Sequence, residues 1–214
     1  FHIKFLSDLI QYIMESNLTH SEIGFIGLGI MGKPMALNLI KSGYHVNFYA
    51  RKKSVINSMV KKGGENVKSI SELASKCKII FLNLTDDQAI NEVICGKNNI
   101  LSNINKHSII IDMSTISPLT SINLAEKLAK KKCDILDAPV SGGEIGAING
   151  NLSIMVGGNK KAFDKIKHIL NCIGRHITYI GQSGSGQIAK ACNQILVAGC
   201  ITAVSEIFAL ARAS

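Results

Sequence analysis

Apolar residues gather in short runs along most of the chain, separated by stretches of mixed polarity. Uninterrupted apolar runs of this length are typical of strands that are buried on both faces. The stretches between them repeat apolar residues every three or four positions, as at Met35, Leu39 and Ile40, which predicts helices. This alternation indicates an α/β fold with a doubly wound parallel sheet of the Rossmann type. We expect strands at residues 23–26, 46–49, 79–84, 109–113, 152–156 and 177–180.

The last part of the chain follows a different pattern. Residues 187–212 contain no proline and predict a single helix, about 39 Å long at the α-helical rise. The middle of this helix is apolar nearly all round, so we expect it to be buried. The preceding domain leaves it nothing to pack against, so we expect either further chain or a second copy to cover it. The expected organisation is an N-terminal extension at 1–21, a dinucleotide-binding domain at 22–183 and an incomplete helical domain at 184–214.

Charge and targeting signals narrow the possible partners. The net charge is +9, with 24 Lys and Arg against 15 Asp and Glu. A basic chain favours anionic partners, yet the lysines are scattered and no aromatic-rich basic motif accompanies them, which disfavours nucleic acid. The longest apolar run, 195–204, is about half the length of a membrane-spanning helix. We see no secretory signal and expect a cytoplasmic protein without membrane contact.

The six cysteines carry no recognisable chemistry. None forms a CxxC pair, and none stands at metal-ligand spacing from a histidine. We therefore interpret them as reduced thiols and expect no metal site.

A glycine-rich turn follows the first predicted strand and opens the first helix. Its sequence is Gly27-Leu28-Gly29-Ile30-Met31-Gly32, a GxGxxG pattern in the strand–turn–helix context that dinucleotide binding requires. The first glycine permits the tight turn, the second admits a pyrophosphate, and the third allows close helix packing. The helix N-terminus then presents amides and a positive dipole to the phosphates. These residues predict a nicotinamide dinucleotide site.

The end of the second strand indicates which dinucleotide is preferred. A carboxylate about twenty residues past the glycine turn would bind the adenosine ribose hydroxyls of NAD. This chain has Ala50, Arg51, Lys52 and Lys53 there instead. Arg51 suits the additional phosphate of NADP, so we expect NADP(H) to be preferred and NAD(H) to remain possible.

Four motifs together resemble the β-hydroxyacid dehydrogenase family. The run at 24–35, GFIGLGIMGKPM, is similar to the family's opening. DMSTISP at 112–118, DAPVSGG at 137–143 and GQIAKACNQ at 186–194 follow in the family's order. The resemblance extends over residues 22–213, and within the family it is greatest to the 2-hydroxy-3-oxopropionate reductases.

The resemblance implies roles for particular residues. Lys190 falls on the family's catalytic lysine, and Asn193 falls on an asparagine that helps to hold the substrate. Ser141, Gly142 and Gly143 fall on the substrate-binding loop. The nicotinamide half of the cofactor would contact Leu84, Thr85 and Thr115, although the family usually has proline where this chain has Thr85.

Simple chemistry agrees with these roles. Lys190 and Asn193 are three residues apart on a predicted helix and so share a face. An ammonium near a carbonyl oxygen stabilises the charge that develops as hydride arrives and then delivers the proton. The amides of Gly142 and Gly143 suit a carboxylate.

We therefore expect an NAD(P)H-dependent oxidoreductase that reduces a small carboxylate-bearing semialdehyde, with Lys190 as the general acid. The resemblance favours tartronate semialdehyde going to D-glycerate. The alternatives are a 3-hydroxyisobutyrate or 4-hydroxybutyrate dehydrogenase, or a glyoxylate/succinic semialdehyde reductase. A non-catalytic dinucleotide-binding scaffold is the alternative of another class. The resemblance also implies a homodimer or homotetramer formed through the complete helical domain.

Overall fold

The computed structural model describes residues 22–213, so the extension expected at 1–21 lies outside the described residues. Nine strands form one sheet in the order β3-β2-β1-β4-β5-β6-β8-β7, and β9 pairs with β8. The strands are β1 (Ile23–Ile26), β2 (Val46–Tyr49), β3 (Glu65–Asn66), β4 (Ile79–Leu82), β5 (Ile109–Asp112), β6 (Asp134–Asp137), β7 (Val140–Ser141), β8 (Leu152–Gly157) and β9 (Gly174–Gly181). All six strands expected from the apolar runs are present.

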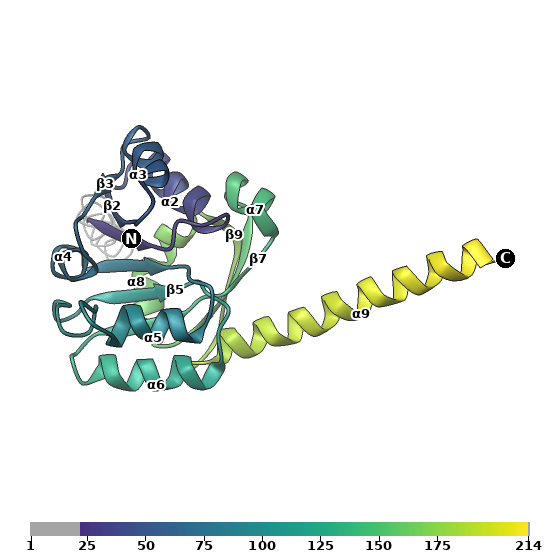
Figure 1. Cartoon of the computed structure of the whole chain (residues 1–214). Helices are drawn as coiled ribbons and strands as arrows, with labels where there is room; N and C mark the ends of the chain where they lie inside the picture. The colour runs from purple at the N-terminus through teal and green to yellow at the C-terminus, as the bar shows by residue number, and fades with distance from the viewer. Residues whose placement is uncertain (1–21, 214) are drawn as a thin grey trace, which may run out of the picture.

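Helices cover both faces of this sheet (Figure 1). They are α2 (Gly32–Lys41), α3 (Lys53–Val60), α4 (Ile70–Lys76), α5 (Asp87–Cys95), α6 (Pro118–Ala129), α7 (Gly143–Asn149), α8 (Lys160–Leu170) and α9 (Ser185–Ala213). The short elements β3, β7, α4 and α7 were not predicted, because two to seven residues are too few to show a period.

The strand residues alternate between two separate hydrophobic cores. Phe81 and Ile111 face one core, which includes buried residues of α2, α3, α7 and α8. Ile80 and Ile110 face the other, which includes buried residues of α4, α5 and α6. Because successive strand side chains point to opposite faces, an uninterrupted apolar run fills both cores at once. The doubly wound architecture is thereby confirmed.

One end of the sheet departs from the expected parallel pattern. Strands β3, β2, β1, β4, β5 and β6 are parallel throughout. Strand β8 runs antiparallel to β6 and to β7, and β9 runs parallel to β8. The direction of a strand depends on the connection that leads into it and not on its apolar run. The short β7–α7 segment turns the chain back, so β8 lies between β6 and β7 and runs antiparallel to both.

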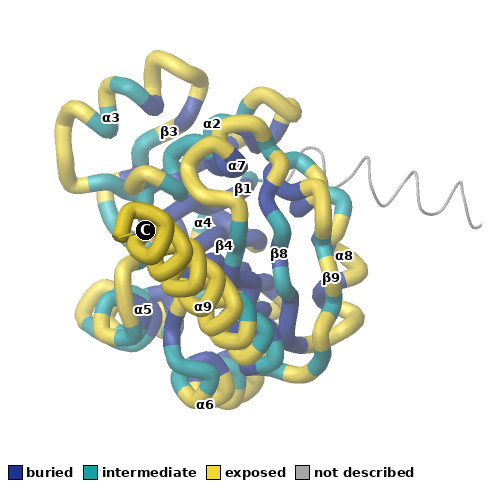
Figure 2. The backbone as a smooth tube through the Cα atoms, turned by 90° about the vertical axis from the view of Figure 1, so that its right-hand side faces the viewer, coloured by how far each residue is buried: buried dark blue, intermediate teal, exposed yellow. Residues whose placement is uncertain are grey.

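Helix α9 contradicts one expectation and confirms another. It is a single helix of 29 residues, as predicted. Figure 1 shows it running away from the sheet, and Figure 2 shows nearly all of it exposed. Its buried residues are Gly186, Gln187 and Lys190, all in its first two turns. The expected burial of its middle is therefore wrong within the described chain, because only its base reaches the domain.

By length and composition α9 is also apolar enough to cross a membrane. The ten-residue run in the sequence underestimated this property, because Gln194 and Ser205 bound the run while apolar residues continue along the helix on both sides of it.

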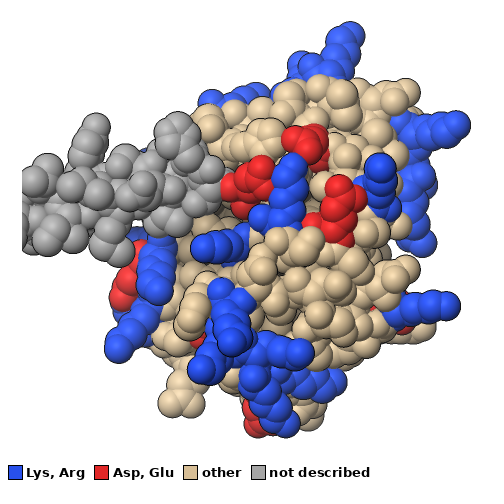
Figure 3. Space-filling view, turned by 90° about the vertical axis from the view of Figure 1, so that its left-hand side faces the viewer, with Lys and Arg blue, Asp and Glu red and all other residues tan. Residues whose placement is uncertain are grey.

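Charged side chains form several groups on the face shown in Figure 3 rather than a continuous basic surface. Glu65 pairs with two neighbouring side chains: Lys76 Nζ lies 2.7 Å and His45 Nε2 lies 2.9 Å from its carboxylate oxygens. Exposed pairs of this kind contribute little to stability.

Candidate functional site

A cleft of about 460 Å³ lies at the carboxyl ends of the parallel strands. Clefts of this size hold small ligands, and in open α/β sheets they form where the strand order reverses, here between β1 and β4. The lining residues come from the loops after β1, β4 and β5, from β7 and the turn after it, and from α9. They are Met31, Asn83, Leu84, Thr85, Met113, Thr115, Val140, Ser141, Gly142, Gly143, Lys190, Gln194 and Val197.

The glycine turn has the geometry that a pyrophosphate requires. Gly27 has φ +99°, and a Cβ there would lie 2.1 Å from the Asn83 carbonyl oxygen. A Cβ on Gly32 would lie 1.8 Å from the Gly27 carbonyl oxygen. A Cβ on Gly29 would meet nothing within 4 Å, so this side of the turn is open. Two of the glycines therefore serve internal packing, and the third leaves room for a ligand.

The start of α2 is equally open. Met31 occupies the N-cap position and makes no side-chain capping hydrogen bond, and the first turn holds no acidic residue. Helix N-termini carry partial positive charge and bind phosphate groups. Leu28 and Met31 are half-buried against the core, while Ile30 is exposed. The residues of the turn therefore fit a dinucleotide.

Arg51 lies directly after β2, the strand beside β1, and is exposed. Lys52 is the N-cap of α3 and makes no side-chain capping hydrogen bond, and the first turn of α3 holds no acidic residue. Three consecutive basic residues at a helix N-terminus oppose the helix dipole. An anion bound between them would remove that conflict.

Lys190 is 8% exposed and lines the cleft from the second turn of α9. Burial lowers the pKa of its ammonium below the ordinary value of 10.5. Within residues 22–213, no carboxylate lies within ion-pair distance of it. A buried, unpaired ammonium that faces a cleft is available to a ligand oxygen.

Asp137, at the carboxyl end of β6, caps the base of α9. Its Oδ1 accepts a hydrogen bond from Gly184 N at 2.8 Å, and its Oδ2 accepts one from Gln187 N at 3.1 Å. Burial raises the pKa of Asp137, and these backbone donors oppose the rise. The structure gives Asp137 the structural role that its place at a strand end suggests.

Gly186 lets the base of α9 approach the sheet. A Cβ at Gly186 would lie 2.4 Å from the Met155 carbonyl oxygen and 2.6 Å from that of Asp137. Only glycine permits this backbone-to-backbone contact.

Gln187 connects α9 to the loop after β5. Its Nε2 donates to the Ser114 carbonyl oxygen at 2.8 Å, and its Oε1 accepts from Ile116 N at 3.2 Å. Ser114 Oγ in turn accepts from Leu84 N at 2.8 Å. Buried hydrogen bonds thus join the loops after β4 and β5 to the helix that carries Lys190.

The turn between β7 and α7 needs glycine at two consecutive positions. Gly142 has φ +134° and Gly143 has φ +62°. The following helix, α7, is held to α2 by Asn38, whose Nδ2 donates to the Ala147 carbonyl oxygen at 2.8 Å. The helix that follows the glycine turn therefore also fixes the loop on the other side of the cleft.

Eight of the fifteen predicted site residues line this cleft, whereas Gly27, Leu28, Gly29, Ile30, Gly32 and Arg51 are not among its lining residues. Met31, Leu84, Thr85, Thr115, Ser141, Gly142, Gly143 and Lys190 all line it. Asn193 does not line it among the described residues; its Nδ2 donates to Gln194 Oε1 at 3.1 Å. Gln194 and Val197, which sequence reasoning missed, line it instead. Helical spacing could have found Gln194, because positions i+3 and i+4 share a face.

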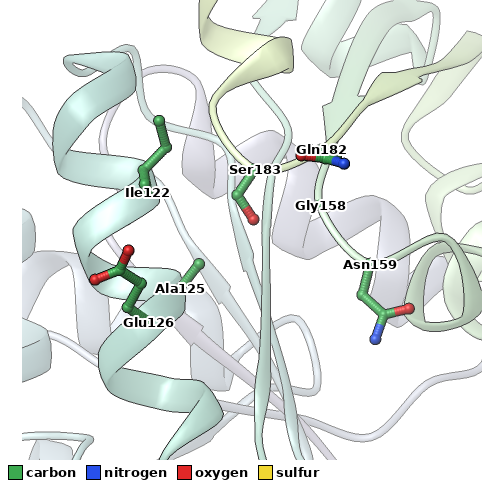
Figure 4. Close-up of a pocket in the computed structure, with 7 residues that line it drawn as sticks. All are labelled: Ile122, Ala125, Glu126, Gly158, Asn159, Gln182 and Ser183. Atoms are coloured by element: carbon green, nitrogen blue, oxygen red, sulfur yellow. The ribbon is translucent and has the colours of Figure 1, made fainter.

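A second hollow, of about 430 Å³, lies between α6 and the turns after β8 and β9 (Figure 4). Glu126 is the one ionisable side chain among its lining residues. None of the residues that line it is basic, so we place the candidate chemistry in the first cleft.

Residues 22–181 match the family described as the NAD binding domain of 6-phosphogluconate dehydrogenase. The chain is also 42% identical over 187 residues to the 2-hydroxy-3-oxopropionate reductase of Escherichia coli, which covers 86% of this chain and 63% of that protein. This chain belongs to the β-hydroxyacid dehydrogenase family. Residues 22–181 are accordingly a nicotinamide dinucleotide-binding domain.

Two further similar proteins are 3-hydroxyisobutyrate dehydrogenases. The mitochondrial 3-hydroxyisobutyrate dehydrogenase of Rattus norvegicus is 40% identical over 201 residues, covering 94% of this chain and 60% of that protein. The structure of Mycobacterium tuberculosis 3-hydroxyisobutyrate dehydrogenase with L-serine superimposes with a TM-score of 0.84 at 29% identity, covering 90% of this chain and 65% of that chain. The chain thus spans 60–65% of the length of these three relatives.

Proposed function

We propose that this chain carries the cofactor site and the proton donor of a reductase that converts a small carboxylate-bearing semialdehyde to its hydroxyacid. The observation that carries the proposal is the buried Lys190 ammonium, which faces a cleft between the loop after β4 and the Ser141–Gly143 loop. The retained lysine also argues against a non-catalytic scaffold.

Lys190 acts as the general acid. Its ammonium hydrogen-bonds to the carbonyl oxygen of the substrate and gives that oxygen a proton as the carbonyl carbon is reduced. The bound nicotinamide supplies the hydride. Because burial lowers the pKa of Lys190 towards the working pH, the ammonium is a better proton donor than an exposed lysine. Solvent then returns the proton to the neutral amine.

The cofactor is NADP(H) in preference to NAD(H). Arg51 stands at the end of β2, where a carboxylate would favour NAD, and the basic start of α3 adds to the positive potential. The glycine turn and the open N-terminus of α2 hold the pyrophosphate. Leu84, Thr85 and Thr115 contact the nicotinamide half.

The substrate is tartronate semialdehyde, which is reduced to D-glycerate. Ser141, Gly142 and Gly143 bind its carboxylate, and Asn193 is a further substrate contact. A 3-hydroxyisobutyrate dehydrogenase is the second candidate, because the rat enzyme of that name is nearly as similar, at 40% against 42% identity.

Residues 184–214 begin a helical domain through which the protein forms a homodimer or homotetramer. The exposed apolar length of α9 supports a partner that covers it, and we propose that this partner is a protein surface. We also propose a cytoplasmic location without nucleic-acid binding, which the interrupted basic groups on the surface support.

The test is NADPH oxidation with tartronate semialdehyde, by the longest natural chain that contains this sequence. Methylmalonate semialdehyde and succinic semialdehyde serve as competing substrates. We expect the highest kcat/KM with tartronate semialdehyde. A higher value with methylmalonate semialdehyde would move the assignment to the second candidate. Absence of turnover with every semialdehyde, despite intact NADPH binding, would favour the non-catalytic dinucleotide-binding scaffold.

A further inference from the structure

The base of α9 alone sets the direction of that helix. Its buried residues end at Lys190, and the remaining turns are exposed. The long exposed part cannot orient Lys190 in the described chain. The position of the ammonium in the cleft must therefore come from contacts in the first two turns.

Gln187 is the residue in these turns whose side chain reaches across to another part of the cleft. It is 2% exposed, and both ends of its amide are used: Nε2 donates to Ser114 O, and Oε1 accepts from Ile116 N. Gly186 lets the backbone of α9 approach the sheet closely. Asp137 accepts hydrogen bonds from the backbone amides of Gly184 and Gln187. Neither of these contacts reaches the loop after β5.

The chain of contacts ends at residues that line the cleft. Ser114 stands between Met113 and Thr115, which both line it, and Ser114 Oγ binds the amide of Leu84, which lines it as well. Gln187 and Lys190 are three residues apart on α9 and share a face. The buried side-chain amide of Gln187 therefore connects the helix that carries Lys190 to the loop after β5 and, through Ser114, to the loop after β4.

We propose that Gln187 is a positioning residue, which fixes Lys190 relative to the loops after β4 and β5 by bridging Ser114 and Ile116. Any effect of this positioning on catalysis rests on the proposed function. The position of the buried ammonium can be tested without measuring turnover.

The first test measures Lys190 directly in Gln187→Met, which keeps the side-chain length and apolar packing but removes both hydrogen bonds. Competitive labelling with trace acetic anhydride over a range of pH gives the pKa of Lys190. Wild type should show a pKa below the ordinary lysine value of 10.5. In the variant, Lys190 should become more exposed, and its pKa should rise by at least half a unit.

The matched control is Gln182→Met, in the exposed turn that precedes α9. It makes the same chemical change without touching the bridge, so the pKa of Lys190 should stay at the wild-type value. A pKa in Gln187→Met that also stays within 0.2 units of wild type, roughly a quarter of a kcal/mol, would overturn the proposal.

The second test uses Gln187→Glu, so that the proposal remains testable if the methionine variant does not fold. A protonated carboxyl group can donate to Ser114 O as the amide does, whereas a carboxylate cannot. Hydrogen exchange of the amides at 185–190, corrected for intrinsic rates, should match wild type at acid pH and increase at least tenfold at neutral pH. Protection that is independent of pH in this variant contradicts the bridge.

Both readouts are independent of catalysis. If Lys190 shifts as expected and the protein still reduces no semialdehyde, the proposed function fails and the positioning role stands. If semialdehyde is reduced and Lys190 does not shift, the positioning role alone fails.

Discussion

The sheet domain and α9 are both rich in apolar residues, but only the sheet domain encloses them. Phe81 is fully buried in β4 and stacks on Phe25 with 5.9 Å between ring centroids. Phe208, in α9, is 63% exposed. The same residue type is therefore buried in the core of one region and exposed to solvent in the other. Apolar composition predicts that a side chain will be buried. The arrangement of the helices and strands decides whether other described residues bury it.

The sharpest test of this contrast is to truncate the same residue type in both regions. Phe81→Ala should lower the free energy of unfolding by about 3–5 kcal/mol, because it removes a fully buried ring and leaves a cavity. Phe208→Ala should change it by less than about 0.5 kcal/mol in this chain. Urea unfolding of the two variants measures both. A loss of several kcal/mol for Phe208→Ala would show that α9 folds back onto the domain.

Glycine substitutions extend the comparison to the backbone. A Cβ on Gly32 would lie 1.8 Å from a carbonyl oxygen, so Gly32→Ala should cost about 1–3 kcal/mol or more and abolish NADPH binding. A Cβ on Gly199, in α9, meets nothing within 4 Å. Gly199→Ala should leave both properties unchanged, or raise helix stability by up to about 1 kcal/mol. Unfolding midpoints and NADPH fluorescence titration provide the measurements.

The pH dependence of stability tests a buried polar group of the sheet domain, the carboxyl group of Asp112. Burial raises the pKa of Asp112 to about 7, from 3.8 when exposed. The folded state then binds more protons than the unfolded state between these values, so the contribution of Asp112 to stability falls as pH rises through this range. Asp112→Asn should remove that fall, which is on the order of 2–4 kcal/mol.

Unfolding of Asp112→Asn and wild type at pH 5 and pH 8 measures the effect, with Asp164→Asn, at an exposed position of α8, as the matched control. An equal loss of stability with pH in wild type and Asp112→Asn would place the titrating group elsewhere.

Cofactor preference is the smallest expected effect. Arg51→Ala should weaken NADPH binding about tenfold, equivalent to roughly 1.4 kcal/mol, and leave NADH binding unchanged. Lys62→Ala, beyond the other end of α3, removes an equal charge away from the predicted phosphate position. Fluorescence titrations with both nucleotides separate the two effects. An equal loss for NADPH and NADH would mean that Arg51 acts through general electrostatics.

The fold was predictable wherever a local pattern determines it. Apolar runs such as 79–84 predicted the buried strands, and the glycine turn predicted the dinucleotide site, since each depends on residues close in sequence. The direction of β8 was not predictable, because it is set by how the short α7 connection turns. Burial of α9 was predicted wrongly, because only its base packs on the domain among the described residues.

The site was predictable to a similar degree. The motifs identified Lys190 and the Ser141–Gly143 loop, which meet in the cleft. The bridge from Gln187 to Ser114 spans 73 residues of sequence, and no periodicity connects two such positions. Gln187 stood inside a recognised motif, yet only the three-dimensional contacts give it a role.

The most direct test of the account is the pH dependence of semialdehyde reduction in wild type and Lys190→Met, measured on the longest natural chain that contains this sequence. Wild-type kcat should fall on the alkaline side as the ammonium deprotonates, with a midpoint below the ordinary lysine value of 10.5. Lys190→Met should lose at least about a hundredfold in kcat, keep NADPH binding and show no such fall. Near-wild-type turnover in the variant, or an unchanged alkaline fall, would contradict the assignment of Lys190 as the proton donor.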